Sequence, residues 1–168
     1  MELSINNQFF SIASDFISNS YVLLFLLSML PVTELRLSLP LGILVLNLPW
    51  QLVFSICVIS NAMIGIFLVY SLDWGLNLFS RITFFKKIIN YFMVRSKKNH
   101  QKYKKYKQYA LILFVGIPLP GTGAWTGALM SYVIGLDKKR SSFSILIGVL
   151  LSGFIMTALS LSGKILLS

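Results

Sequence analysis

The sequence predicts an all-α integral membrane protein made of two inverted repeats. Each repeat is expected to be a re-entrant hairpin of broken helices followed by one transmembrane helix, and an amphipathic helix with a basic loop joins the repeats. The composition supports a membrane protein, because 56% of the 168 residues are hydrophobic and 12% are charged, against about 25% charged in soluble domains. Two apolar segments are long and unbroken, and two others are interrupted by proline and glycine.

The first interrupted segment covers residues 16–48 and is broken by residues 31–40, which begin and end with proline. Its two limbs, 16–30 and 41–48, have fifteen and eight residues, whereas a membrane-spanning helix needs roughly 20. Irregular backbone survives at membrane depth only where protein or a wet cavity covers it. We therefore expect a re-entrant hairpin, with an extended backbone across the break.

The second interrupted segment covers residues 109–136 and is broken by residues 118–123, which contain two prolines and two glycines. Its first limb, 109–117, has only nine residues. The same length argument predicts a second re-entrant hairpin. Broken helices in matching positions of two halves are typical of a transporter's binding site.

Two segments are long enough to cross the membrane, residues 50–72 and 141–162. Between them, residues 74–95 place apolar and polar side chains on opposite helical faces, which predicts an amphipathic helix lying in the interface. Residues 96–107 follow as a basic loop interleaved with tyrosines. We expect this loop to contact membrane lipids as well as to orient the chain.

We expect one membrane domain over residues 1–168, with repeat one at 16–72, a connecting region at 74–108 and repeat two at 109–163. A shift of 87 residues aligns Pro31 with Pro118 and residues 50–72 with 137–159. Ten of the fifteen Lys and Arg residues lie in the stretch 81–107, which the positive-inside rule places in the cytoplasm together with 138–140. The first hairpin then enters from outside and the second from the cytoplasm, in the cytoplasmic (inner) membrane.

Glu34 and Arg36 are the main candidate site residues, and Thr33 and Pro40 flank them in the same break. An ionisable residue inside a membrane segment costs at least ~2.5–3.5 kcal/mol, so it indicates function by default. Arg36 could hold an anionic group through its planar fork. Glu34, if removed from water, would titrate nearer neutral pH and could carry a proton. The alternative is a structural ion pair that fixes the tip of the hairpin.

The second break has no charge and contributes backbone groups instead. Its glycines permit positive φ and close backbone approach, and the helix that follows can present free N–H groups to an anion. The alternative is a packing turn at the tip of the hairpin. The candidate residues here are Pro118, Pro120, Gly121, Thr122, Gly123 and Trp125.

Other classes of site have little support in the sequence. One histidine and one cysteine provide no metal-ligand cluster and no nucleophile–histidine–acid set, so we expect no enzyme, no metal and no cofactor. A nucleic-acid partner is not expected, because a basic run in so apolar a chain is typical of a membrane-proximal loop. A homodimer is expected, since one small chain offers few helices to enclose a cavity.

Two segments resemble the family of small multidrug export proteins, and the resemblance extends from about residue 21 to 162. They are Glu34-Leu-Arg36-Leu-Ser-Leu-Pro40-Leu-Gly42 and Pro118-Leu-Pro120-Gly-Thr-Gly123-Ala-Trp125-Thr-Gly-Ala. The layout is more distantly similar to the DedA family, which implies acidic residues for proton coupling and arginines for phosphate. Gly123 and Ala124 stand where that family has an arginine, which argues against a phosphate substrate.

The expected function is secondary transport or export of a small amphipathic molecule or a lipid carrier, coupled to protons through Glu34. The alternative is a non-transporting membrane scaffold or assembly factor, in which Glu34 and Arg36 only lock the first hairpin. We expect a transporter to show a polar cavity that reaches Glu34. We also expect the two breaks to meet inside the protein.

Overall fold

The computed structural model describes residues 19–79 and 104–167, and within these ranges all regular structure is helical. It comprises six α-helices and one π-helix, η1. In chain order they are α2 (Ser20–Met29), α3 (Glu34–Pro40), η1 (Leu41–Val45), α4 (Trp50–Phe79), α6 (Lys104–Gly116), α7 (Ala124–Val133) and α8 (Lys138–Leu167).

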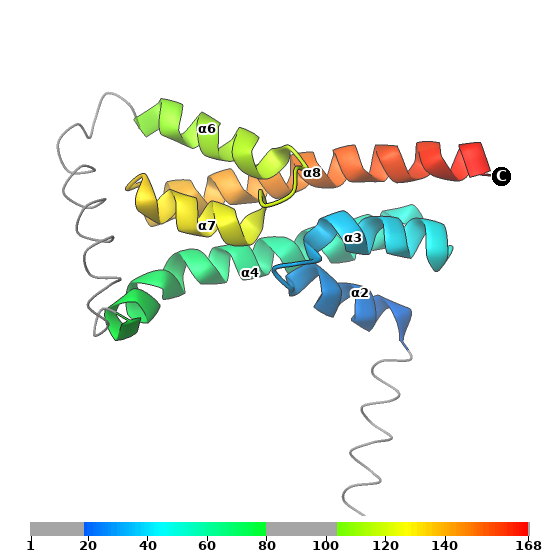
Figure 1. Ribbon diagram of the computed structural model, residues 1–168, viewed down its shortest axis with the longest axis horizontal. Helices are drawn as coiled ribbons and strands as arrows, with labels where there is room; N and C mark the ends of the chain where they lie inside the picture. The colour runs from blue at the N-terminus through cyan, green and yellow to red at the C-terminus, as the bar shows by residue number, and fades with distance from the viewer. Residues whose placement is uncertain (1–18, 80–103, 168) are drawn as a thin grey trace, which may run out of the picture.

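Helices α4 and α8 are the long axis of the molecule and run in opposite directions side by side (Figure 1). The apolar part of α4, Trp50–Leu72, has 23 residues, and an 18-residue stretch within it has a mean hydropathy of 2.5. In α8, Lys138–Leu166 has 29 residues, and an 18-residue stretch within it has a mean hydropathy of 2.2. Both are long and apolar enough to cross a membrane. The two predicted spans are therefore confirmed as helices, and α8 begins three residues before the predicted start.

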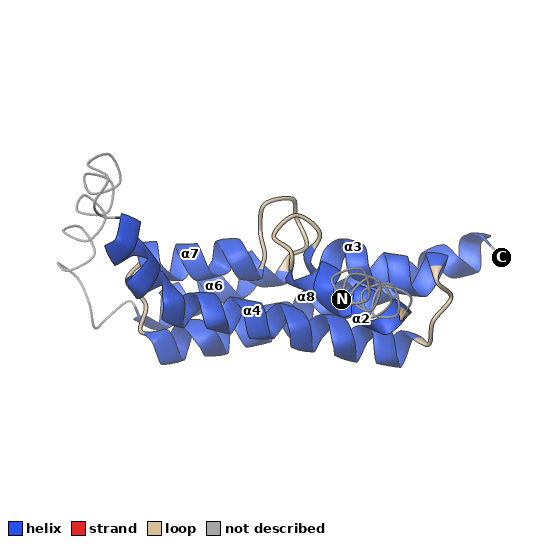
Figure 2. Ribbon diagram, turned by 90° about the horizontal axis from the view of Figure 1, so that it is seen from below, coloured by secondary structure: helices blue, strands red, loops and turns tan. Residues whose placement is uncertain are grey.

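Two helical hairpins pack on this pair from opposite ends. The first hairpin consists of α2, the turn at residues 30–33, α3 and η1, and the second consists of α6, the loop at residues 117–123 and α7. Figure 1 shows the two tips near the middle of the α4–α8 pair, while the open end of each hairpin lies at one end of the molecule. Figure 2 shows the loop of the second hairpin beside α3.

The first break is shorter than the sequence analysis predicted. Only residues 30–33 interrupt the helices, and Glu34–Pro40 forms α3 where we expected an extended backbone. The run Leu-Arg-Leu-Ser-Leu favours a helix, and Pro40 is tolerated because it stands where α3 passes into the looser π-helix, whose Leu46 N–H bonds to Leu41 O at 2.9 Å. The turn at residues 30–33 ends at Glu34, the first residue of α3, whose φ is +44°.

The connecting region also differs from its prediction where the structure describes it. Residues 74–79 continue α4 and do not begin a separate amphipathic helix. Lys104, Lys105 and Lys107 belong to the first turns of α6, which extends the second hairpin beyond its predicted start at residue 109. A positively charged run of good helix formers can continue an apolar helix into the interface. Residues 80–103 lie outside the described part of the chain.

Small residues let the second hairpin pack closely on α8. Val115 of α6 fits between Gly127 of α7 and Gly148 of α8, and a Cβ at either glycine would lie 2.4 Å or 2.6 Å from a Val115 side-chain atom. Close backbone approach at small residues is typical of helix packing in membranes. These contacts hold the loop at residues 117–123 against the middle of the α4–α8 pair.

Candidate functional site

The candidate site is the meeting point of the two hairpin tips. Each tip contains a helix end, and the polar backbone groups at helix ends have no partner within the helix. In an apolar surrounding each such group costs several kcal/mol if it stays unpaired. The structure pairs the helix ends of one hairpin with side chains from the other.

Glu34 stands at the start of α3 and places its carboxylate at the N-terminus of α7. Its Oε1 accepts a hydrogen bond from the backbone N–H of Trp125 at 3.3 Å, and the residue is only 5% exposed. The positive end of the α7 dipole favours a negative charge in this position. Glu34 is thus an N-terminal cap for a helix that begins 90 residues later in the chain.

Gly123 makes this approach of Glu34 to α7 sterically feasible. It is the N-cap of α7 with φ +157°, and a Cβ on it would lie 1.8 Å from Glu34 Oε2. Any other residue would therefore have to displace the carboxylate. The sequence analysis predicted that glycines in the second break allow close approach, and at Gly123 this is confirmed.

Arg36 lies on α3 and binds the loop of the second hairpin. Its Nη1 donates to the carbonyl oxygen of Leu119, and its Nη2 donates to the Thr122 hydroxyl at 2.7 Å. That hydroxyl lies 2.7 Å from the carbonyl oxygen of Ile117 and donates a hydrogen bond to it. Ile117 directly follows the last residue of α6. Arg36 therefore binds the loop that follows α6, while Glu34 binds the N-terminus of α7.

Glu34 and Arg36 are near each other but do not form a close ion pair. The distance between Glu34 Oε2 and Arg36 Nη2 is 3.9 Å, and the hydrogen bonds of both groups that reach another element go to the second hairpin. Both residues belong to α3 and not to the extended backbone that the sequence analysis predicted for this break. Glu34, the first residue of α3, has a positive φ of +44°.

The carbonyl end of α2 is bound by side chains from three other parts of the chain. The indole N–H of Trp125 donates to Met29 O at 2.9 Å, and the Asn61 amide of α4 donates to Ser28 O at 2.8 Å. The Thr33 hydroxyl donates to Leu27 O. Trp125 therefore bonds to both limbs of the first hairpin, through its indole to α2 and through its backbone to Glu34.

A buried polar pair that the sequence analysis missed lies behind the tip. The hydroxyls of Ser28 and Ser38 are 2.6 Å apart, and both residues are fully buried. Ser38 also donates to the backbone oxygen of Glu34. Serines in an apolar helix were too weak a signal by themselves.

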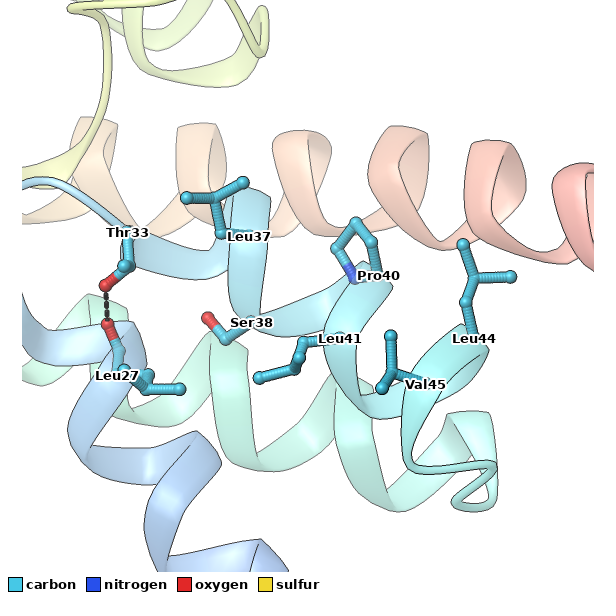
Figure 3. A pocket seen from close by; sticks show the side chains of 8 residues that line it. All are labelled: Leu27, Thr33, Leu37, Ser38, Pro40, Leu41, Leu44 and Val45. Carbon is cyan, nitrogen blue, oxygen red and sulfur yellow. Dashed lines mark hydrogen bonds between the residues drawn. The ribbon is translucent and has the colours of Figure 1, made fainter.

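The remaining candidate residues lie around this centre in the breaks themselves. Gly121 has φ +80° in the exposed part of the loop, and Pro118 and Pro120 lie in the same loop. Thr33 and Pro40 face a different feature. They line an open groove of about 360 Å³ between α2, α3 and η1 (Figure 3).

The groove is apolar, and neither Glu34 nor Arg36 lines it. Its two hydroxyls, from Thr33 and Ser38, are hydrogen-bonded within the first hairpin. Figure 3 shows the bond from Thr33 to Leu27. The other lining residues are Leu27, Leu37, Pro40, Leu41, Leu44 and Val45. The groove is therefore not the polar cavity reaching Glu34 that we expected of a transporter, and both charged groups are engaged by the opposite hairpin.

The described residues contain no group of three or more His, Cys, Asp or Glu side chains that could hold a metal ion. The site offers one carboxylate, one guanidinium, hydroxyls and helix ends. Such groups can bind an anionic or protonatable molecule, and the carboxylate can carry a proton.

Comparison with known proteins identifies a family but no individual relative. The family model described as "Putative small multi-drug export protein" matches residues 34–155, which are 122 of the 168 residues. The match begins at Glu34, so it includes the charged pair of the first hairpin and the whole loop of the second, but not the turn at residues 30–33. It does not show the more distant similarity to the DedA family. Comparisons with curated proteins and with solved structures each found no match. Because the match covers most of the chain, including the site, this membrane protein belongs to the small multi-drug export family.

Proposed function

We propose that the chain is a secondary exporter of a small amphipathic molecule or a lipid carrier, and that Glu34 and Arg36 close its pathway. The observation that carries this proposal is the direction of their hydrogen bonds. Both charged groups of the first hairpin bind the tip of the second. We call this set of bonds the tip lock.

The proposal includes the membrane topology. We infer that both hairpins are re-entrant and that the two halves are inverted repeats. Helix α2 has 10 residues, or about 15 Å of length, which is half of the ~30 Å hydrocarbon core. Helix α7 also has 10 residues. Tips near the middle of two spanning helices would then lie near the bilayer midplane, where transporter sites with broken helices are found.

The orientation follows from the charges at the two ends of the α4–α8 pair. Lys138, Lys139 and Arg140 begin α8 at the end where α6 also begins with lysines. The positive-inside rule assigns this end to the cytoplasm. The first hairpin then opens to the outside and the second to the cytoplasm, in the inner membrane.

Transport requires the tip lock to open, because a substrate cannot pass the tips while they are bonded to each other. Protonation of Glu34 removes the negative charge at the N-terminus of α7 and weakens that bond. A proton on Glu34 would thus favour the open state. This links the proton gradient to the movement of the hairpins without a further cofactor.

The test is flux in proteoliposomes with and without a pH gradient. Two probes represent the two substrate classes, ethidium for a small amphipathic molecule and a fluorescent short-chain phospholipid for a lipid carrier. We expect gradient-dependent movement of one probe by the unmodified protein and none by Glu34→Gln. The matched control is Asp137→Asn, which removes an exposed carboxylate far from the tips.

The same experiment tests the scaffold alternative. If neither probe moves faster than in protein-free liposomes, the export proposal is wrong, and the tip lock is a structural connection. If Glu34→Gln transports as well as the unmodified protein, export stands but Glu34 is not its proton carrier.

A further inference from the structure

The end of the molecule where α6 and α8 begin carries a concentrated positive charge. Among the side chains that the structure describes, five basic residues lie there against one acidic residue, Asp137, which leaves a net charge of +4. The basic residues are Lys105, Lys107, Lys138, Lys139 and Arg140. At the opposite end, Lys164 near the end of α8 is the one charged residue that the structure describes.

This charge is unfavourable for the helices that carry it. Helix N-termini are positive ends of dipoles and favour acidic side chains, whereas basic residues there are destabilising. Helix α8 begins with Lys138, Lys139 and Arg140 and has no acidic residue in its first turn, although Asp137 directly precedes it. Like charges that lie close together also repel one another. An anion bound at this end would reduce this repulsion and would complement the dipole of α8.

The protein neutralises only part of this charge itself. Arg140 Nε lies 3.6 Å from Asp137 Oδ2, Lys138 Nζ lies 5.6 Å from the centre of the Tyr70 ring, and Lys107 donates to Ile134 O at 2.7 Å. Lys105 and Lys139 are exposed on two different helices. They are the residues best placed to meet an external anion.

Tyrosines show at which depth this end lies. Tyr70 on α4 is 52% exposed, and Tyr106 and Tyr109 on α6 are 72% and 63% exposed. Exposed tyrosines are enriched at the level of lipid headgroups, where the ring is in the apolar layer and the hydroxyl in water. The lysines and tyrosines together therefore lie at one membrane surface.

We propose that this end is a binding surface for anionic phospholipid headgroups, formed jointly by the starts of α6 and α8 and the adjacent turn of α4. We call it the basic end. Charge complementarity selects the partner, because a phosphodiester headgroup with net negative charge satisfies lysines on both helices, whereas a zwitterionic headgroup brings its own cation. A headgroup bound to both helices would connect α6 with α8. It would also connect them with α7, because Lys107 of α6 already donates a hydrogen bond to Ile134 O at the end of α7. The surface does not depend on export.

The experiment uses the full chain purified in a neutral detergent. Dioleoyl phosphatidylglycerol and dioleoyl phosphatidylcholine are titrated separately, and retained lipids are counted by native mass spectrometry. We expect the protein to retain phosphatidylglycerol at concentrations where phosphatidylcholine is lost. The double variant K105Q/K139Q should weaken phosphatidylglycerol binding by about 25-fold, at about fivefold per charge.

Two controls separate charge and position. K105R/K139R keeps the charge and should bind like the unmodified protein. K164Q removes a lysine at the opposite end and should change binding less than twofold. The proposal is overturned if K105Q/K139Q binds phosphatidylglycerol as tightly as the unmodified protein, if K164Q has an equal effect, or if phosphatidylcholine binds equally well.

Discussion

The tips of the two hairpins meet, but they are built from different chemical groups. The first tip contributes charged side chains, Glu34 and Arg36, and the second contributes mainly backbone groups from a loop rich in proline and glycine. The carboxylate of the first binds a helix N-terminus of the second, and the guanidinium binds a loop carbonyl. This difference teaches that the two breaks are complementary and not duplicates, although they occupy corresponding positions in the chain.

The strongest test of this comparison is the membrane topology of the two hairpins. In a Cys57→Ala background, we expect Asn19→Cys and Leu48→Cys to react with a membrane-impermeant maleimide from outside the cell. Gln108→Cys and Asp137→Cys should react only after the cells are opened, because we propose that the second hairpin enters from the cytoplasm. The effect is all or none.

Labelling of the two ends of one hairpin on opposite faces would show that this hairpin crosses the membrane. The inverted arrangement of the halves would then be wrong. The contact between the tips would remain, but its assignment to the bilayer midplane would not.

A large effect on both stability and transport is expected at Gly123, which adjoins the Glu34 carboxylate. Gly123→Ala places a methyl group on the Glu34 carboxylate, and overpacking of this kind costs about 1–3 kcal/mol. We expect a lower unfolding temperature and loss of transport in the proteoliposome assay.

Gly163→Ala is the matched control, because a Cβ at Gly163 of α8 meets no atom within 4 Å. It should unfold at or slightly above the temperature of the unmodified protein, since alanine favours a helix interior. Equal unfolding temperatures for Gly123→Ala and Gly163→Ala would contradict this prediction. They would show that the contact between the Glu34 carboxylate and the N-terminus of α7 does not stabilise the protein.

Arg36 tests the other half of the tip lock. Arg36→Lys keeps the charge but cannot bond Leu119 O and the Thr122 hydroxyl together with the geometry of a guanidinium. Hydrogen bonds to charged groups contribute about 1.5–3 kcal/mol each, so we expect Arg36→Gln to lower stability more than Arg36→Lys. Unfolding monitored by circular dichroism in detergent checks this order. Equal losses in both variants would mean that the charge of Arg36 adds nothing to its contacts.

Much of this site could be predicted from the sequence, because its strongest signals are local. An ionisable pair inside an apolar run marks the first tip, and a loop rich in proline and glycine marks the second. Because the two breaks have matching positions in the two halves of the sequence, we predicted that they meet. The helix at Glu34–Pro40 was not predicted, since the two prolines suggested an open break, whereas the leucine-rich run between them is helical. Prolines limit only the ends of that run.

The partners of each group could not be predicted, because they depend on three-dimensional placement. No pattern in the sequence indicates that Trp125 reaches Met29 or that Ser28 meets Ser38. The groove shows the same limit. The sequence placed Thr33 and Pro40 with the charged pair, but the helical form of α3 directs them to an apolar surface on another side.

The smallest effect is expected at Trp125, the side chain by which the second tip binds the carbonyl end of α2. Trp125→Phe keeps an aromatic ring of similar shape but removes the indole N–H and leaves Met29 O without that donor. A lost neutral hydrogen bond costs about 1 kcal/mol, and more if the acceptor stays unpaired. Trp50→Phe, at the 41% exposed start of α4, is the control. We expect Trp125→Phe to lower the unfolding temperature modestly relative to Trp50→Phe while transport persists, because the tip lock through Glu34 and Arg36 is intact. Loss of transport in Trp125→Phe would instead show that this neutral hydrogen bond is as necessary for transport as the bonds of Glu34 and Arg36. The charge of the first tip would then not explain its role.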